Sequence, residues 1–154
     1  RAANVFGPGQ PLYRIIPRTV LYIRLGRRLQ LHGGGHSTRS FIHARDVSDA
    51  TERVLLHGRP GSTYHISTDR IISIRELVQL ICSRMAVRFE DCVDIVGERL
   101  GKDSSYQLDS SRIREQLGWK DCISLEDGIT QTIAWVDKWF DDLRRLPWDY
   151  QHKA

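Results

Sequence analysis

The order of hydrophobic and polar residues predicts a chain in which helices alternate with short strands. Apolar residues recur every three or four positions in five segments, as on the buried face of a helix: 12–25, 47–56, 74–85, 110–117 and 125–143. Shorter apolar or alternating runs indicate strands at 1–6, 29–32, 40–43, 63–67 and 93–96. Because the strands are few and short, we expect a small mixed α/β layer, too small to be a complete doubly wound sheet.

Polar residues mark where several of these helices begin. Ser73 and Glu76 have the spacing of a capping box, in which a hydroxyl and a carboxylate each accept a backbone N–H of the other residue. Pro17 lies inside the first helical pattern, and proline is tolerated in a first turn, so the alternative start of that helix is Ile16–Pro17. The predicted N-caps of three other helices are Asp46, Asp109 and Ser124.

Length and composition are those of one globular domain. With 154 residues, 40% of them hydrophobic and 27% charged, we expect a single folded unit over residues 1–146 and a loosely held tail at 147–154. No apolar run reaches the roughly 20 residues of a membrane-spanning helix, so no membrane partner is expected. The three cysteines lack a CxxC spacing, which argues against a disulfide framework or a zinc site and for structural thiols in a reducing compartment.

The first residues have the pattern of a buried strand and no initiator Met precedes them. Residues 1–6 are followed by Gly-Pro-Gly, which ends a strand sharply. A strand at the very first residue needs neighbours with which to pair. We therefore expect the chain to be the carboxyl-terminal, ligand-holding portion of a larger α/β enzyme.

Charge is distributed unevenly along the chain. The net charge is +4, yet eight arginines and no acidic residue precede Asp46. Arginine suits forked contacts with phosphate, so this segment indicates an anionic partner; the alternative is a solvated basic helix face. A nucleic-acid partner is not expected, because the sequence has neither interleaved aromatic and basic residues nor a zinc or helix-turn-helix signature.

Five segments resemble, in the same order, motifs of the extended short-chain dehydrogenase/reductase family of NAD-dependent epimerases and dehydratases. They are Asn4–Pro8 (N-[VI]-[YF]-G-P), His32–Asp46 (the Gly-containing block that ends in VxD), Tyr64–Ser67 (YNIG), Ser73–Leu77 (xSxxEL) and Ser111–Trp119 (SKIrrELGW). Together they cover about residues 1–140. Within the family the motifs are most similar to nucleotide-sugar 4,6-dehydratases of the dTDP-glucose type.

The resemblance implies a small mixed α/β substrate-binding portion that lacks the amino-terminal Rossmann half. In the family that half carries a Gly-rich NAD loop and a Tyr-x-x-x-Lys pair. No Tyr of this chain has Lys four residues later, and neither Gly7–Gly9 nor Gly33–Gly35 has the GxxGxxG spacing. We therefore expect no catalytic residue, no NAD-binding residue and no metal ligand in this chain.

The implied parent enzyme converts a nucleotide-diphosphate hexose to the 4-keto-6-deoxy sugar. It would bind NAD mainly through the missing Rossmann half, act as a homodimer and work in the cytoplasm, whereas the isolated chain should be inactive. Two alternatives stay open. The parent could be a nucleotide-sugar epimerase or decarboxylase, or the chain could be a stand-alone nucleotide-sugar-binding module.

The resemblance also implies which residues bind the nucleotide sugar. Asn4 matches a substrate-contacting Asn, whose amide offers a donor and an acceptor. Arg39 matches a phosphate-binding Arg, for which the alternative is a surface ion pair with Asp46. Ser73 matches a site residue, although its capping role alone would explain it. Arg14 and Ile15 match a basic and apolar pair at a helix start. Gln30, Leu31 and His32 match a stretch that lines the pocket of the nucleotide base. Arg99 and Lys102 belong to a segment that matches a phosphate-binding loop.

Overall fold

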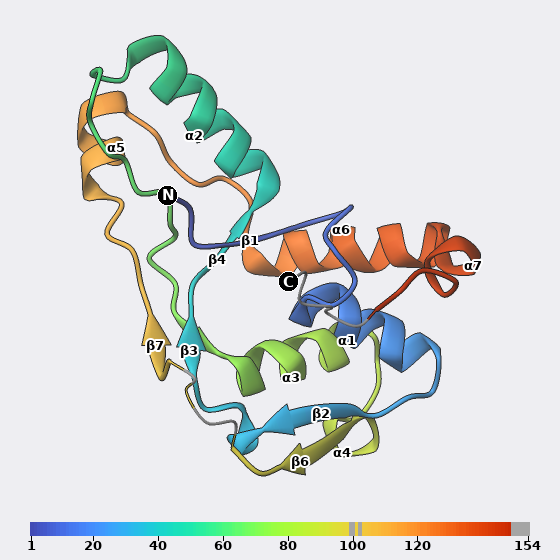
Figure 1. Cartoon of the computed structure of the whole chain (residues 1–154). Helices are drawn as coiled ribbons and strands as arrows, with labels where there is room; N and C mark the ends of the chain where they lie inside the picture. Colours follow the sequence, from blue (N-terminus) through green and yellow to red (C-terminus); the bar gives the residue numbers. More distant parts are fainter. Residues whose placement is uncertain (99–100, 102, 149–154) are drawn as a thin grey trace.

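The computed structural model describes residues 1–98, 101 and 103–148 (Figure 1). Its helices are α1 (Ile15–Arg24), α2 (Ala44–His57), α3 (Ile74–Arg84), α4 (Phe89–Cys92), α5 (Ser111–Leu117), α6 (Leu125–Lys138) and α7 (Phe140–Leu143). Its strands are β1 (Asn4–Phe6), β2 (Leu29–His32), β3 (Thr38–Arg39), β4 (Phe41–His43), β5 (Ile72–Ser73), β6 (Val93–Val96) and β7 (Ser105–Tyr106). A 3-10 turn, η1 (Gly33–Gly35), follows β2.

The strands form three small sheets. β1 pairs with β4 and β2 pairs with β6, both in parallel. β3 lies between β5, which is antiparallel to it, and β7, which is parallel. The strand predicted at 63–67 is wrong, because a single bridge between Ile66 and Ala2 is all that this stretch forms. The predicted mixed α/β layer with few, short strands is confirmed.

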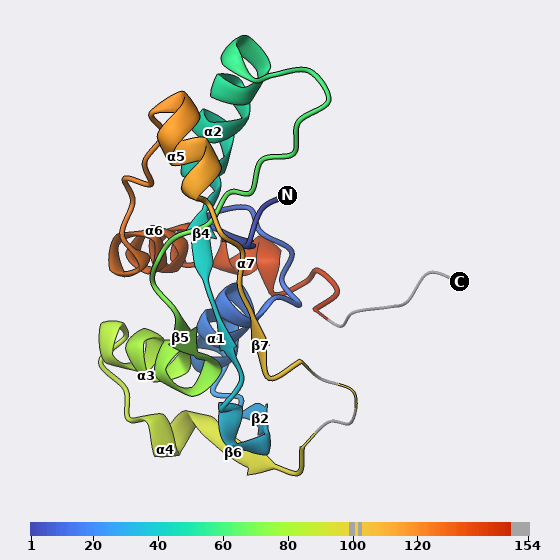
Figure 2. The same ribbon diagram turned by 90° about the vertical axis from the view of Figure 1, so that its left-hand side faces the viewer.

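The helices pack around three apolar clusters that follow one another along the molecule. α1, α3 and α6 surround the largest cluster, which is centred on Val20, Ile81 and Ile129. A second cluster joins α2 and α5 at one end, and a third joins β2 and β6 to α3 at the opposite end. Figure 2 shows this order, with α2 and α5 at one end and α4, β2 and β6 at the other.

Asp46 and Trp119, which come from two of the family motifs, hold the α2–α5 end together. The Trp119 ring is completely buried, and its Nε1 donates to the Asp46 carbonyl oxygen at 3.2 Å. The Asp46 carboxylate accepts the backbone N–H groups of Cys122 and Ile123, each at 3.1 Å. The prediction that Asp46 caps its own helix is therefore wrong. His43 is the N-cap, and its Nδ1 accepts an N–H of the first turn at 3.2 Å.

Other predicted helix ends agree with the structure more closely. The capping box of Ser73 and Glu76 is confirmed, and Ser124 caps α6. The helix predicted to start at Ile16–Pro17 or earlier starts at Ile15, with Pro17 in its first turn. The predicted N-cap of α5, Asp109, is wrong by one residue, because the N-cap is Ser110. The Asp109 carboxylate still accepts the backbone N–H of Ser111 at 2.8 Å.

The last predicted helix is shorter than expected. α6 ends at Lys138 rather than at residue 143, because Trp139 leaves helical geometry with φ −111° and ψ 19°. Beyond α7, the Trp148 ring contacts the Tyr22 ring at 6.1 Å between centroids, and Arg27 lies over it at 4.6 Å. Within the described residues, no helix is long and apolar enough to cross a membrane.

Candidate functional site

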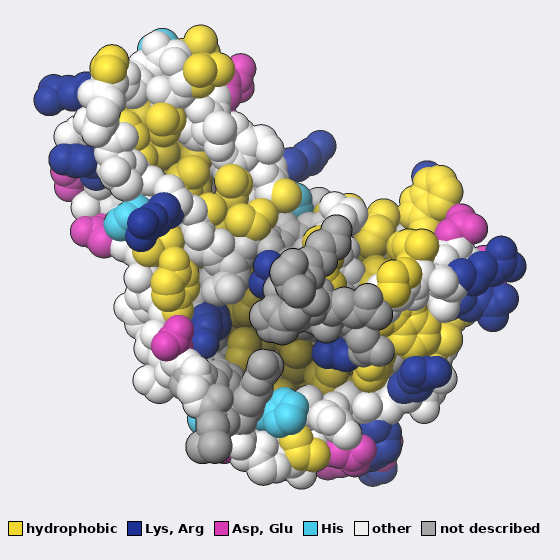
Figure 3. Space-filling model, in the orientation of Figure 1, with side chains coloured by type: hydrophobic (Ala, Val, Ile, Leu, Met, Phe, Trp, Pro, Cys, Tyr) yellow, Lys and Arg dark blue, Asp and Glu magenta, His cyan; other side chains and the backbone are white. Residues whose placement is uncertain are grey.

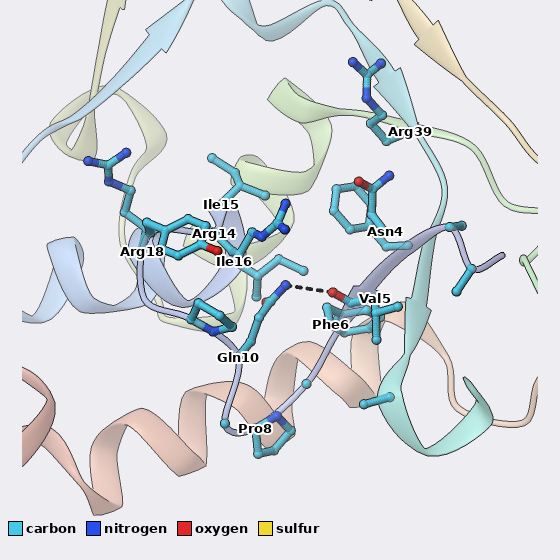
Figure 4. Close-up of a pocket in the computed structure, with 18 of the residues that line it drawn as sticks. Asn4, Val5, Phe6, Pro8, Gln10, Arg14, Ile15, Ile16, Arg18 and Arg39 are labelled. Carbon is cyan, nitrogen blue, oxygen red and sulfur yellow. Dashed lines mark hydrogen bonds between the residues drawn. The ribbon is translucent and has the colours of Figure 1, made fainter. Parts of the chain in front are cut away.

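A cavity of about 1110 Å³ opens between β1, the 7–13 loop, the start of α1 and the paired strands β3 and β7. Figure 4 shows the walls of this cavity. Arg14 lies at the N-cap of α1 and Arg18 on α1 itself, whereas Asn4 lies on β1 and Arg39 on β3. In the space-filling view, hydrophobic side chains and a few Lys or Arg side chains gather in the centre of the face where this cavity lies (Figure 3).

The start of α1 forms one wall of the cavity and has no side-chain cap. Arg14 is the N-cap residue, and the first turn contains no acidic residue. Ile15 and Ile16 are the first two helical residues and line the cavity. Backbone N–H groups in a first turn have no partner within the helix, and the helix dipole makes this end positive. This wall therefore favours an anion.

Among the described residues, three arginines and no acidic residue line the cavity. Arg14 lies over the Tyr13 ring, with 5.4 Å between its guanidinium carbon and the ring centroid, and it forms no ion pair with any described residue. Arg18, one helical turn further on, lies over the Tyr22 ring at 5.3 Å. The three guanidinium groups give the lining of the cavity positive charge.

Arg39 faces the cavity from β3 and is oriented by two backbone carbonyls. Its Nη1 donates to the Thr38 oxygen at 2.7 Å and its Nη2 to the Asp103 oxygen at 2.8 Å. A guanidinium has five N–H donors, so three stay available to a ligand. The alternative ion pair with Asp46 is excluded, because that carboxylate binds the backbone beyond Trp119.

Asn4 and Gln10 line the cavity from the first strand and the loop after it. Asn4 Nδ2 donates to the Ser40 carbonyl at 3.1 Å, which fixes the amide next to the cavity. Gln10 Nε2 donates to the Val5 carbonyl at 2.7 Å and so holds the loop that contains Gly7 and Gly9 against β1. The Gln10 Oε1 is buried and has no hydrogen-bond partner among the described residues.

Gln10, Arg18 and Tyr106 are cavity residues that the sequence analysis missed. Arg18 could have been found, because positions four apart on a helix share a face and Arg14 was already a candidate. Tyr106 could not, since β7 has two residues and therefore no period to detect. Gln10 lies in a Gly- and Pro-rich loop, where hydrophobic spacing carries no information.

Four other expected site residues lie away from this cavity. Leu31 is buried in the third apolar cluster, whereas Gln30 and His32 are exposed on β2. His32 Nδ1 lies 3.2 Å from the Gly97 carbonyl oxygen. The Ser73 hydroxyl donates to Glu76 Oε2 at 2.6 Å and accepts the Glu76 N–H at 3.1 Å.

These contacts engage the Ser73 hydroxyl within the capping box, and they hold the pKa of Glu76 below its usual value. Arg99 and Lys102, the expected residues of the phosphate loop, lie outside the described residues. The cavity thus brings together Asn4, Arg14, Ile15 and Arg39 from the expected set.

Comparisons with known proteins agree with the resemblance seen in the motifs. A family model described as GDP-mannose 4,6 dehydratase matches residues 2–132. The chain belongs to this family. A dTDP-D-glucose 4,6-dehydratase from Homo sapiens is 34% identical over 151 residues, which cover 95% of this chain and 43% of that protein.

Solved structures of relatives share the fold of this family member. DesIV, a dTDP-glucose 4,6-dehydratase from Streptomyces venezuelae with NAD bound, matches with 31% identity and a TM-score of 0.85, over 90% of this chain and 42% of that one. MoeE5 in complex with UDP-glucose and NAD matches with 26% identity and a TM-score of 0.82, over 91% and 46%. The chain therefore spans less than half the length of these relatives, and the predicted family and fold class are confirmed.

Proposed function

We propose that this chain is the nucleotide-sugar-binding part of an NAD-dependent nucleotide-sugar 4,6-dehydratase. The observation that carries the proposal is the cavity at the start of α1, whose described lining residues include three arginines and no acidic residue. A nucleotide-diphosphate sugar supplies what such a cavity lacks: a compact double negative charge with several oxygen acceptors. The similarity to dTDP-glucose 4,6-dehydratases supports the same choice of ligand class.

The diphosphate lies between the helix and the strand in this proposal. Arg14 and the N–H groups of the first turn of α1 bind it from one side, and the free donors of Arg39 bind it from the other. Charge-assisted hydrogen bonds contribute about 1.5–3 kcal/mol each, so this set can anchor the ligand without any contact to the base. Asn4 Oδ1 and Gln10 Oε1 are acceptors for hydroxyl groups of the sugar.

The other expected residues complete the proposed site outside this cavity. Gln30, Leu31 and His32 are proposed to bind the base, and Ser73 to lie at the edge of the site. Arg99 and Lys102 would add positive charge from the phosphate loop. These roles come from the family motifs.

The chemistry itself belongs to the parent enzyme. NAD, bound mainly by the Rossmann half, accepts the hydride from C4 of the hexose; water then leaves across C5–C6, and the hydride returns to C6. The cavity residues of this chain hold the nucleotide end, so that the sugar reaches that half in one orientation. We further propose that the parent is a cytoplasmic homodimer.

Calorimetric titration tests the proposed ligand class. The chain is titrated with dTDP, UDP, GDP and CDP, beside Arg39→Ala and the control Arg45→Ala, which removes an exposed arginine of α2 outside the cavity. We expect saturable binding of one nucleotide, lost in Arg39→Ala and retained in Arg45→Ala. Equal binding by both variants would contradict the proposed contact between Arg39 and the diphosphate.

A further inference from the structure

The residue between β3 and β4 is a buried serine that fixes the position of Asn4. Ser40 is 1% exposed, and it stands where the chain passes from the β5–β3–β7 sheet into the β1–β4 sheet. Its carbonyl oxygen accepts two hydrogen bonds from Asn4, one from the backbone N–H at 3.2 Å and one from the side-chain Nδ2 at 3.1 Å. The orientation of the Asn4 amide in the cavity wall therefore depends on where this carbonyl lies.

The Ser40 hydroxyl binds a second buried serine. Ser40 Oγ and Ser67 Oγ lie 3.1 Å apart, and Ser67 is also 1% exposed. Because Ser67 Oγ donates its hydrogen to the Thr68 carbonyl at 3.2 Å, Ser40 is the donor in the bond between the two hydroxyls. A buried hydroxyl that loses its partner is costly, so this bond holds the junction of β3 and β4 in one place.

Ser67 is in turn held by helix α5. Its carbonyl oxygen accepts the Ser110 hydroxyl at 3.1 Å and Arg114 Nη2 at 2.9 Å. The Arg114 guanidinium also donates to Ser110 Oγ at 3.1 Å and to Asp121 at 2.6 Å. Ser67 is therefore a fixed anchor, and hydrogen bonds connect α5 through Ser67 and Ser40 to the wall of the cavity.

We propose that Ser40 and Ser67 are positioning residues of the nucleotide-sugar site, which act through Asn4. The inference rests on the proposed function, because it takes Asn4 Oδ1 to bind a hydroxyl group of the sugar. The bond between the serines fixes the Ser40 carbonyl, and the carbonyl orients the Asn4 amide before the ligand arrives. A group that is already ordered loses less conformational freedom on binding. Removing the bond between the serines should thus weaken binding through Asn4.

The position of the Asn4 amide can be measured directly, because Asn4 is the single asparagine of the sequence. In a chain isotopically labelled at asparagine alone, NMR shows one pair of side-chain amide signals. We expect Ser40→Ala to shift or broaden this pair in the free protein, and Ser67→Ala, which removes the other hydroxyl of the same bond, to do the same. The matched control is Thr132→Val, which removes a buried hydroxyl bound to the Gly128 carbonyl within α6 and should leave the pair in place.

Calorimetry with dTDP-glucose and UDP-glucose measures the consequence for binding. For the nucleotide sugar that the wild-type chain binds, Kd should rise about 3- to 10-fold in Ser40→Ala, as for the loss of one hydrogen bond. In an Asn4→Ala background the same substitution should change Kd by less than about twofold, since no amide is left to misplace. Thr132→Val should lower the Tm about as much as Ser40→Ala does and keep the wild-type Kd.

Three results would overturn the inference alone, in a wild-type chain that binds the nucleotide sugar. They are Asn4 amide signals that Ser40→Ala leaves unmoved, a wild-type Kd in that variant, and a loss of affinity in Ser40→Ala that is undiminished in the Asn4→Ala background. Equal losses of affinity in Ser40→Ala and Thr132→Val would also overturn it, because general loosening of the fold would then explain both. Absence of saturable binding by the wild-type chain would overturn the proposed function, and this inference with it.

Discussion

Replacing Arg14 by Gln should weaken nucleoside-diphosphate binding while leaving the fold intact. Arg14 forms no ion pair with any described residue, and the contact that it loses is the one with the Tyr13 ring. An exposed cation–π contact contributes about 0.5–1 kcal/mol, so the Tm should fall by less than about 4 °C. A lost charge-assisted hydrogen bond costs about 1.5–3 kcal/mol, which corresponds to about 10- to 100-fold in Kd.

The assay is calorimetry with the nucleotide that the wild-type chain binds, together with thermal unfolding of each variant. Arg45→Gln removes the same charge from an exposed position that does not line the cavity and should leave Kd within about twofold, since solvent and salt screen an exposed charge that does not contact the ligand. Arg14→Lys keeps the charge and should lose less affinity than Arg14→Gln. Equal Kd values for wild type and Arg14→Gln would refute the reasoning, as would equal losses in Arg14→Gln and Arg45→Gln.

Three further predictions concern the scaffold. Ser73→Ala should cost about 1 kcal/mol of unfolding free energy in urea, through loss of the helix cap. Asp46→Ala should cost about 3 kcal/mol or more by the same assay, since two part-buried N–H groups lose their charged, buried acceptor. Asp49→Ala, which breaks an exposed ion pair on α2, should cost under about 1 kcal/mol. Burial lowers the pKa of His43 in the folded protein, so the imidazole of the unfolded chain binds a proton more readily. The free energy of unfolding should therefore fall as the pH drops below about 6.5, the pKa of histidine in the unfolded chain. His43→Gln should reduce this dependence of the unfolding free energy on pH.

Local signals in the sequence predicted the elements where a residue acts on its own neighbours. The Ser73 and Glu76 box fixes the start of α3 within four residues, and the 93–96 strand follows from its own apolar pattern. Asp46 had the residue type and position of a cap, but its carboxylate binds backbone more than seventy residues away. A long-range contact of this kind leaves no mark in the local pattern.

The same limit applies to the candidate site. Asn4, Arg14, Ile15 and Arg39 were expected from the family motifs, and the structure places them around one cavity. The sequence could not show whether Arg39 forms an ion pair with Asp46. The Asp46 carboxylate instead accepts backbone N–H groups of the chain just after Trp119, a contact that only the fold brings about. Trp139 shows a further limit: apolar spacing continues through it, yet the helix ends there.

Mapping the bound nucleotide on the chain tests the central claim most directly. In an NMR titration of the isotopically labelled chain with dTDP and UDP, binding at the start of α1 should shift the amide signals of Ile15, Ile16 and Arg39 and the side-chain amide of Asn4. Ala44, the first residue of α2, lines the cavity, but signals from α5 and from the C-terminal half of α2, at the far end of the molecule, should stay in place (Figure 2). Saturable shifts confined to α2, α5 or the β2–β6 sheet, with the cavity residues unmoved, would contradict the account.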